Sequence, residues 1–263
     1  MTYKSGNLVK SVEPIIREAG AIVLSYFHKA IARTEKKDQG FATQADIASE
    51  QYIIQALKNI MPEASFFAEE SGKTGSGDYC WVIDPLDGTT NFAYGFPYFG
   101  ISIALTYKNK PVFGMIFDPL HDELYWAEQD LGAYSKSKGE TRPISVSKTS
   151  ELAQALILLS VPYAKDAQFA YVVAKATQLM EQTFAFRHMG AVALDQMAVA
   201  LGRADGMFFT NLGWYDVAAG MLIIKEAGGS VSTFEGTEVE PNYRSYVAGN
   251  PEIYQKLRSS LAL

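Results

Sequence analysis

Residues 81–92, with the sequence WVIDPLDGTTNF, constrain this chain more than any other stretch. An apolar strand runs directly into two carboxylates, Asp84 and Asp87, which are only three residues apart, and small donor-rich residues follow. Like charges at this spacing repel, so either a cation lies between them or one of them holds a proton. Carboxylates at strand ends face clefts more often than cores, so we expect this strand to end at a site.

The residues around the acid pair favour a cation. Pro85 restricts the backbone of the turn, and Gly88 lets the backbone come close to a ligand. We expect a helix to begin at Thr89, so that its free N–H groups form an anion site. Acids beside an anion site require a cation that joins them, and an all-oxygen ligand set without a nearby His or Cys selects Mg²⁺ rather than Zn²⁺.

Two other segments carry acids at a strand end or a helix start. Glu69 and Glu70 follow the strand SFFA, and Asp216 precedes the helical sequence VAAG. Taken alone, the glutamates are typical of a surface acid pair, and Asp216 is typical of a helix N-cap. A second Asp-Pro-Leu triplet, at residues 118–120, has His121 in place of the second acid and no Gly-Thr after it, so we interpret it as a turn.

The other chemically reactive residue types give no second site. His28, His121 and His188 are scattered, and each is expected to be structural or exposed. No nucleophile elbow supports a Ser-His-Asp triad. Cys80 is the only cysteine, and its place before an apolar strand predicts a buried or half-buried structural thiol.

The spacing of apolar residues predicts the secondary structure. Helices are expected at residues 8–27, 45–60, 165–182, 190–202, 217–229 and 252–263. Strands are expected at residues 65–72, 81–84, 98–107, 111–118, 123–128, 155–161, 206–210 and 245–250, with a hairpin turn at 108–110. The polar stretch 34–46 is expected to be a loop.

The chain of 263 residues suits one large domain or two joined subdomains, which we place at residues 1–145 and 146–263. The first has an α+β pattern and the second an α/β pattern, so packed layers are expected. A net charge of −6 and scattered Lys and Arg argue against nucleic-acid binding. No stretch approaches the ~18 apolar residues of a membrane span and the start lacks a signal-peptide pattern, so a cytoplasmic protein is predicted.

Three segments resemble the motifs of the inositol monophosphatase family: FAEES at 67–71, WVIDPLDGTTNF at 81–92 and WYDVAAGMLIIKEAGG at 214–229. The resemblance covers nearly the whole chain, including residues 41–46 and 186–206. It implies a layered αβαβα sandwich, usually a homodimer, and a Mg²⁺-dependent, Li⁺-sensitive phosphatase for small phosphate esters. Four acids and a phosphate monoester are approximately balanced by two or three Mg²⁺ ions.

The resemblance implies a role for each matching residue. The implied metal ligands are Glu69, Asp84, Asp87, Asp216 and the backbone carbonyl of Leu86. Thr89 and Asp46 match the pair that positions and activates the attacking water, and Glu69 also belongs to the catalytic set. The implied substrate contacts, which include the phosphate cradle at Gly88 and Thr89, are Glu69, Leu86, Asp87, Gly88, Thr89, Arg187, Gly190, Ala191, Val192 and Asp216.

Three positions depart from the family pattern, all on the substrate side. Phe209 stands seven residues before Asp216, where many inositol-type members carry a glutamate that binds sugar hydroxyls. Loss of such a hydrogen bond costs a site about 1–3 kcal/mol when the partner stays unpaired. Tyr215 replaces the usual Trp before the aspartate, and Ala191 stands where a small hydroxyl residue is common.

These observations leave three functional hypotheses open. The first is a Mg²⁺-dependent phosphatase for inositol 1-phosphate or a similar small sugar phosphate. The second keeps the chemistry but acts on fructose 1,6-bisphosphate, 3′-phosphoadenosine 5′-phosphate, NADP⁺ or histidinol phosphate, because Phe209 could face a base or ring. The third is a non-catalytic binding or regulatory protein on the same fold.

Overall fold

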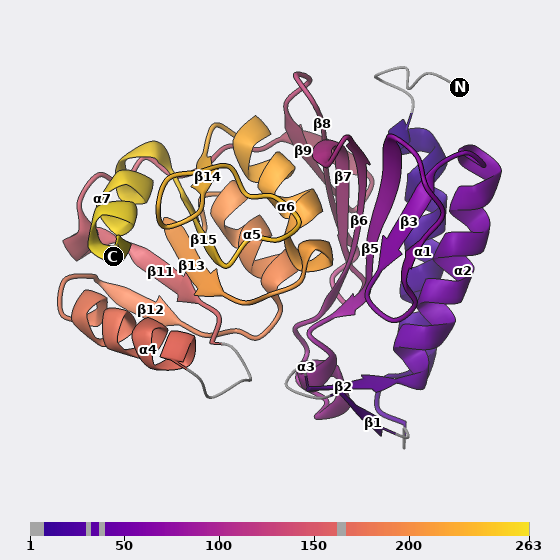
Figure 1. The fold of residues 1–263 in the computed structure, drawn as a ribbon, viewed down its shortest axis with the longest axis horizontal. Coiled ribbons are helices and arrows are strands. Elements are labelled where there is room, and N and C mark those ends of the chain that lie inside the picture. Colours follow the sequence, from indigo (N-terminus) through magenta and orange to yellow (C-terminus); the bar gives the residue numbers. More distant parts are fainter. Residues whose placement is uncertain (1–7, 30–32, 37–39, 162–166, 263) are drawn as a thin grey trace.

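The elements form five layers in the computed structural model, which describes residues 8–29, 33–36, 40–161 and 167–262 (Figure 1). Two helices cover the outer face of a first sheet, two helices lie between this sheet and a second one, and two helices cover the second sheet's outer face. This arrangement is the αβαβα sandwich that the family resemblance implies. Within the described residues, no helix is both long and apolar enough to cross a membrane.

The outer layer beside the first sheet consists of α1 (Leu8–Tyr26) and α2 (Gln44–Ile60). Between them, β1 (Arg33–Lys36) and β2 (Gly40–Thr43) pair antiparallel. The prediction of a loop over residues 34–46 is therefore wrong for most of this stretch, and residues 37–39 lie outside the described part. These two short strands pair through their backbone groups and show no alternation of apolar and polar residues, so the sequence gives no periodic signal for them.

The first sheet has eight strands in the order β10-β9-β8-β7-β6-β5-β3-β4, of which only β3 and β5 are parallel. The strands are β3 (Ser65–Ala68), β4 (Gly72–Thr74), β5 (Tyr79–Asp87), β6 (Gly100–Tyr107), β7 (Lys110–Asp118), β8 (Glu123–Glu128), β9 (Ala133–Ser137) and β10 (Glu140–Pro143). Register shifts between Asp84 and Asp87 break the pairing of β5 with β6, so the acidic end of β5 is bulged.

The layer between the sheets consists of α5 (Val192–Ala200) and α6 (Trp214–Glu226). Both helices are buried on nearly every side because each faces a sheet on either side. Gly114 of β7 allows α6 to pack closely, since a Cβ at this position would lie 2.7 Å from the carbonyl oxygen of Ala219. The short helix α3 (Thr89–Ala93) follows β5 directly.

The second sheet has the order β12-β11-β13-β15-β14, with parallel pairing of β11 to β12 and β13 and antiparallel pairing at β15. Its strands are β11 (Leu156–Leu159), β12 (Ala185–Arg187), β13 (Gly206–Thr210), β14 (Ser230–Ser232) and β15 (Ser245–Gly249). The outer helices are α4 (Ala167–Met180) and α7 (Pro251–Leu261), and a 3₁₀ turn, Leu152–Gln154, precedes β11.

Most predicted elements occur within a few residues of the predicted bounds, including the hairpin turn, where Lys108 and Asn109 have positive φ. Strands β4, β9, β10, β12 and β14 were not predicted from the sequence, because strands of only three to five residues carry little periodic signal. Cys80 is half-buried, as expected, and burial raises the pKa of its thiol. The division at residue 145 stays a prediction.

Candidate active site

Three acids from distant parts of the chain converge. Asp84 and Asp87 lie at the bulged end of β5, and Asp216 lies in the first turn of α6. Each offers a carboxylate oxygen, and these atoms all lie within 4.8 Å of one another. Asp216 is 132 residues from Asp84 and 129 residues from Asp87 in the sequence. The fold brings the three side chains together, as a shared cation site requires.

Burial is the main cause of the raised pKa values of Asp84, Asp87 and Asp216. It raises the pKa of Asp84 and of Asp216 well above the usual range, and the charge of Glu69 is the next largest cause in both. Burial also raises the pKa of Asp87, to about 7. None of the ion pairs found among the residues that the structure describes includes Asp84, Asp87 or Asp216. Without a cation, burial and mutual repulsion therefore favour the protonated forms of these carboxyls.

The side chain of Asp87 also caps the N-terminus of α5. Its Oδ2 accepts a hydrogen bond from the backbone N–H of Ala193 at 2.6 Å. The N-cap position of α5 is Ala191, which has no side chain able to accept such a bond. A carboxylate from β5 therefore supplies the acceptor that Ala191 lacks.

Asp216 is the third residue of α6 and not its N-cap, so the N-cap expectation is wrong. The helix begins at Trp214 after the N-cap Gly213, and Asp216 Oδ2 accepts a hydrogen bond from the N–H of Gly213. Gln196 of α5 donates to the carbonyl oxygen of Asp216 at 2.7 Å, and Tyr246 donates to Gln196 Oε1 at 3.0 Å. The turn that carries Asp216 is therefore fixed to α5.

Glu69 directly follows β3, beside the acid trio. Its N–H donates to the carbonyl oxygen of Ile83 at 3.1 Å, which continues the parallel pairing of β3 with β5. Its charge is one cause of the raised pKa of all three acids. Both Glu69 and Glu70 are half-buried, so they are not the solvated surface pair that they resemble when taken alone.

Thr89 contacts both Asp46 and the acidic turn. Its Oγ1 lies 3.0 Å from Oδ1 of Asp46 and 2.9 Å from the carbonyl oxygen of Leu86, and its single hydrogen can donate to either. Burial raises the pKa of Asp46 to about 7, although the hydrogen bonds that it accepts from Thr43 lower it. A carboxyl with this pKa can exchange a proton near neutral pH. The N–H of Leu86 donates to Asp84 Oδ1 at 3.0 Å.

The predicted cradle residues lie where two segments meet. Gly88 has φ of +86° as the N-cap of α3, and α3 begins at Thr89 as predicted. A Cβ at Gly88 would lie 2.9 Å from the Cβ of Ala191 and 3.3 Å from the carbonyl oxygen of Gly190. The backbone at Gly88 therefore directly contacts residues 190–191, and Val192 follows them as the first residue of α5.

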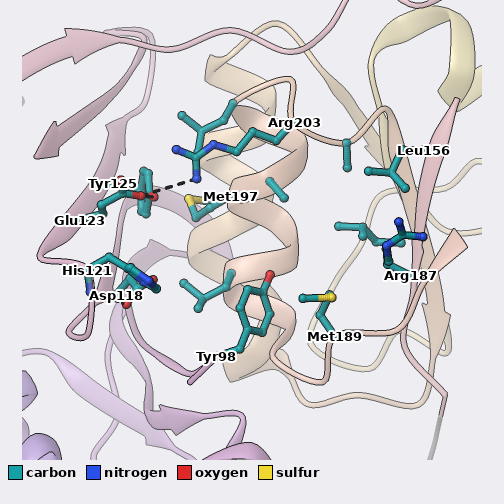
Figure 2. Close-up of a pocket in the computed structure, with 15 residues that line it drawn as sticks. Tyr98, Asp118, His121, Glu123, Tyr125, Leu156, Arg187, Met189, Met197 and Arg203 are labelled. Atoms are coloured by element: carbon teal, nitrogen blue, oxygen red, sulfur yellow. Dashed lines mark hydrogen bonds and ion pairs between the residues drawn. The ribbon is translucent and has the colours of Figure 1, made fainter. Parts of the chain in front are cut away.

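A cleft with a volume of about 400 Å³ lies on one side of α5 (Figure 2). Tyr98, Met189 and Arg187 line it, and Figure 2 shows an ion pair between Arg203 and Glu123, 3.6 Å apart, at another part of its wall. Its lining includes none of the three clustered acids. Arg187 is exposed, and one of its guanidinium nitrogens donates to Phe186 O. Its substrate contact stays a prediction.

Phe209 is a core residue. Its side chain is fully buried, stacks on the ring of Tyr246 at 4.5 Å between centroids, and meets Tyr243 edge-on. The expectation that Phe209 could face a base or ring of the substrate is wrong, because β13 directs it into the layer between the sheets. Tyr215 is half-buried, and its ring meets Phe67 edge-on at 5.9 Å.

The second Asp-Pro-Leu triplet is a turn, as predicted. Asp118 Oδ1 accepts hydrogen bonds from the N–H groups of Leu120 and His121, and the ring of His121 lies 2.7 Å from Asp118 Oδ2. His28, His121 and His188 are all exposed, which agrees with the expectation that each is structural or exposed.

Comparison with known proteins decides the family. A model of the inositol monophosphatase family matches residues 7–262. The chain belongs to this family. The inositol-1-monophosphatase of Synechocystis sp. is 35% identical over 247 residues, which span 93% of this chain and 85% of the relative. The Nus factor SuhB of Pseudomonas aeruginosa is 35% identical over 254 residues, spanning 93% and 92%.

Solved structures of proteins similar to this chain have the same fold. The extragenic suppressor protein SuhB from Bartonella henselae superposes with a TM-score of 0.90 at 32% identity, covering 97% of this chain and 98% of the other. Membership of the inositol monophosphatase family makes the chain a phosphoric monoester hydrolase of the inositol-phosphate phosphatase type.

The family is metal-dependent, and the acid trio fits a metal ion. Its donors are all carboxylate oxygens, which suit hard cations. The raised pKa values of Asp84, Asp87 and Asp216 also favour a bound cation. A cation between the carboxylates would offset the cost of burying their charges and would reduce their mutual repulsion.

Proposed function

We propose that this chain hydrolyses inositol 1-phosphate, or a similar small sugar or polyol phosphate, with Mg²⁺ as its metal. The observation that carries the proposal is the convergence of Asp84, Asp87 and Asp216 within 4.8 Å at the end of β5. The family membership supplies the reaction class, phosphomonoester hydrolysis. The substrate and the choice of metal are our own inference from the residues.

Five groups would hold the metal. They are the carboxylates of Glu69, Asp84, Asp87 and Asp216 and the carbonyl oxygen of Leu86. Two or three Mg²⁺ ions would balance these acids and a bound phosphate, and when bound they would supply Lewis-acid activation of water and stabilisation of the leaving group. The protein's contribution is then mainly positioning and charge stabilisation, as in other phosphoryl transfers.

Thr89 and Asp46 are proposed to handle the proton of the attacking water. The hydroxyl of Thr89 can accept a hydrogen bond from water while it donates its own hydrogen to Asp46 Oδ1, 3.0 Å away. The pKa of Asp46, raised to about 7 by burial, suits an acceptor that takes up and returns a proton near neutral pH. No covalent phosphoenzyme is needed.

The substrate is proposed to lie over the junction of α3 and α5. The backbone of Gly88 and the start of α3 at Thr89 would contact the phosphate, and residues 190–192 and Arg187 would contact the alcohol side of the substrate or its phosphate. The close approach of Gly88 to residues 190–191 supports one continuous contact surface.

A phosphate-release screen with Mg²⁺ tests this proposal. The panel contains inositol 1-phosphate, fructose 1,6-bisphosphate, 3′-phosphoadenosine 5′-phosphate, NADP⁺ and histidinol phosphate. We expect the highest kcat/KM for inositol 1-phosphate, and no turnover in Asp84→Asn. A clear preference for a nucleotide would contradict the substrate, and full activity of Asp84→Asn would contradict the site. The burial of Phe209 removes the observation that favoured nucleotide substrates.

A second, regulatory function is favoured by one observation. Several relatives with 33–35% identity are named Nus factor SuhB, which is not the name of a phosphatase. We propose that the same fold can serve as a regulatory partner, as a homodimer. A purified dimer that binds Mg²⁺ but hydrolyses no phosphate ester would favour this function over the first. Light scattering of the purified protein checks the dimer.

A further inference from the structure

One face of α2 contacts three separate segments of the active site. Asp46, Ser49 and Glu50 stand at positions i, i+3 and i+4, which share a face of a helix. All three are polar yet at most 3% exposed. Buried polar groups need hydrogen-bond partners, so their positions are tightly constrained by the atoms that they bind.

Glu50 holds the turn that follows Glu69. Its Oε2 accepts a hydrogen bond from the N–H of Glu70 at 2.8 Å, and its Oε1 accepts one from the N–H of Ser71 at 2.9 Å. On the other side, the N–H of Glu69 is bonded to the carbonyl oxygen of Ile83. The backbone of Glu69 is thus fixed from both directions, and hydrogen bonds to a carboxylate are stronger than neutral ones.

The other two residues of this face fix the acidic turn and Thr89. Ser49 Oγ donates to the carbonyl oxygen of Pro85 at 3.0 Å, between Asp84 and Asp87. Asp46 Oδ1 accepts from Thr89. A single rigid helix therefore sets the relative positions of segments that the proposed function assigns to the metal and the water.

We propose that Glu50 is a positioning residue for metal binding: by holding the turn behind Glu69, it places that carboxylate against the acid trio. Ser49 does the same for the turn at Pro85. This inference rests on the proposed metal site. Partners that orient metal ligands change metal affinity by about 10–100-fold when they are lost. A carboxylate that only stabilises the fold would change thermal stability and leave metal affinity unaltered.

The chain contains a matched control for this distinction. Glu226, near the end of α6, also accepts two backbone hydrogen bonds with its two oxygens, from Asp130 at 2.9 Å and from Gly132 at 2.8 Å. It stands ten residues after Asp216, about 15 Å along the helix. Glu226→Gln therefore removes the same kind of clamp at a place remote from the acids.

The experiment compares wild type, Glu50→Gln and Glu226→Gln, with Mg²⁺ alone as the probe. Isothermal titration calorimetry gives the Kd for Mg²⁺, and thermal unfolding in EDTA gives the stability of the metal-free protein. We expect both variants to lose Tm, and only Glu50→Gln to raise the Kd, by about 10–100-fold. Addition of saturating Mg²⁺ should recover part of its phosphatase activity.

The other possible results decide as follows. An unchanged Kd in Glu50→Gln, or an equal rise in Glu226→Gln, would overturn the inference while wild-type activity leaves the proposed function intact. A wild type that binds no Mg²⁺ would overturn both. If Glu50→Gln does not fold, Glu50→Asp keeps the charge but shortens the reach, and Ser49→Ala removes the second clamp; an unchanged Kd in both would also overturn the inference.

Discussion

The carboxylate of Asp87, in the first sheet, accepts a hydrogen bond from the N–H of Ala193, in the first turn of α5, at 2.6 Å. The bond spans 106 residues of sequence. One side chain thus serves two purposes, because it caps a helix that lacks its own capping residue and belongs to the acid cluster. Substitutions at Asp87 can separate these purposes.

Asp87→Asn is expected to keep the cap and lose the metal. Asn is as good an N-cap as Asp, whereas Ala is much poorer, and the difference is about 1 kcal/mol. Asp87→Asn should therefore retain near-wild-type stability in EDTA but show no Mg²⁺-dependent turnover, while Asp87→Ala should lose both. Urea unfolding and phosphate release measure the two effects. Equal destabilisation by Asn and Ala would argue against the capping role.

Thr89→Val should slow the chemical step without removing the metal. The variant keeps the shape of the side chain but loses the hydroxyl that lies 3.0 Å from Asp46. General acid–base contributions are about 10²–10⁴-fold, so kcat should fall by this order while the Kd for Mg²⁺ stays within a few-fold. Thr89→Ser is the control and should retain most activity. A large change in the Kd of Thr89→Val for Mg²⁺ would instead indicate that Thr89 takes part in metal binding.

Stabilisation by Mg²⁺ should grow as the pH rises from 5 to 8. The folded, metal-free protein has the pKa of Asp87 raised to about 7, and those of Asp84 and Asp216 also raised, so it binds more protons than the unfolded chain between the usual carboxyl pKa and pH 7. The contribution of these three acids to stability is therefore fully present below the usual carboxyl pKa and is lost as the pH rises from there through about 7.

Mg²⁺ binds the deprotonated carboxylates, so it competes with these protons. The increase in Tm from EDTA to Mg²⁺ should consequently be small at pH 5 and large at pH 8. Asp84→Asn should remove most of this pH dependence. An increase in Tm that is independent of pH would mean that these acids do not hold the metal.

Phe209→Glu should destabilise the protein and not improve activity on inositol 1-phosphate. The substitution restores the residue type of many inositol-type members, but Phe209 is fully buried against Tyr246. Burying an unpaired carboxylate costs several kcal/mol. Phe209→Leu is the control and should cost less, because it leaves a cavity but buries no charge. A stable Phe209→Glu variant with increased kcat/KM would show that the side chain can reach the substrate.

The sequence predicts the features that are coded locally. The strand before Asp84 and the helix start at Thr89 follow from short patterns. The helix of the third motif was expected from residue 217, but it begins three residues earlier, at Trp214, so that Asp216 lies in its first turn. The family resemblance, together with the repulsion between Asp84 and Asp87, predicts that Asp216 joins them. Nothing in the spacing of residues 84 and 216 would predict this contact alone.

The contacts that sequence reasoning missed are pairings of backbone groups with distant side chains. The capping of α5 by Asp87 and the clamp of Glu50 on the turn at Glu70 join segments 106 and 20 residues apart. A missing capping residue at Ala191 was a signal that some other acceptor must serve α5. The orientation of Phe209 depends on the register of β13 with β15, which no local pattern fixes.

The contact of Gly114 with the backbone of Ala219 makes the spacing of the acids depend on a position that carries no chemistry. Asp84 belongs to the first sheet and Asp216 to α6, which lies against that sheet. Any side chain at residue 114 would push one group of ligands away from the other. Inactivating mutations in this enzyme should therefore arise at the seam between helix and sheet as readily as at the carboxylates themselves.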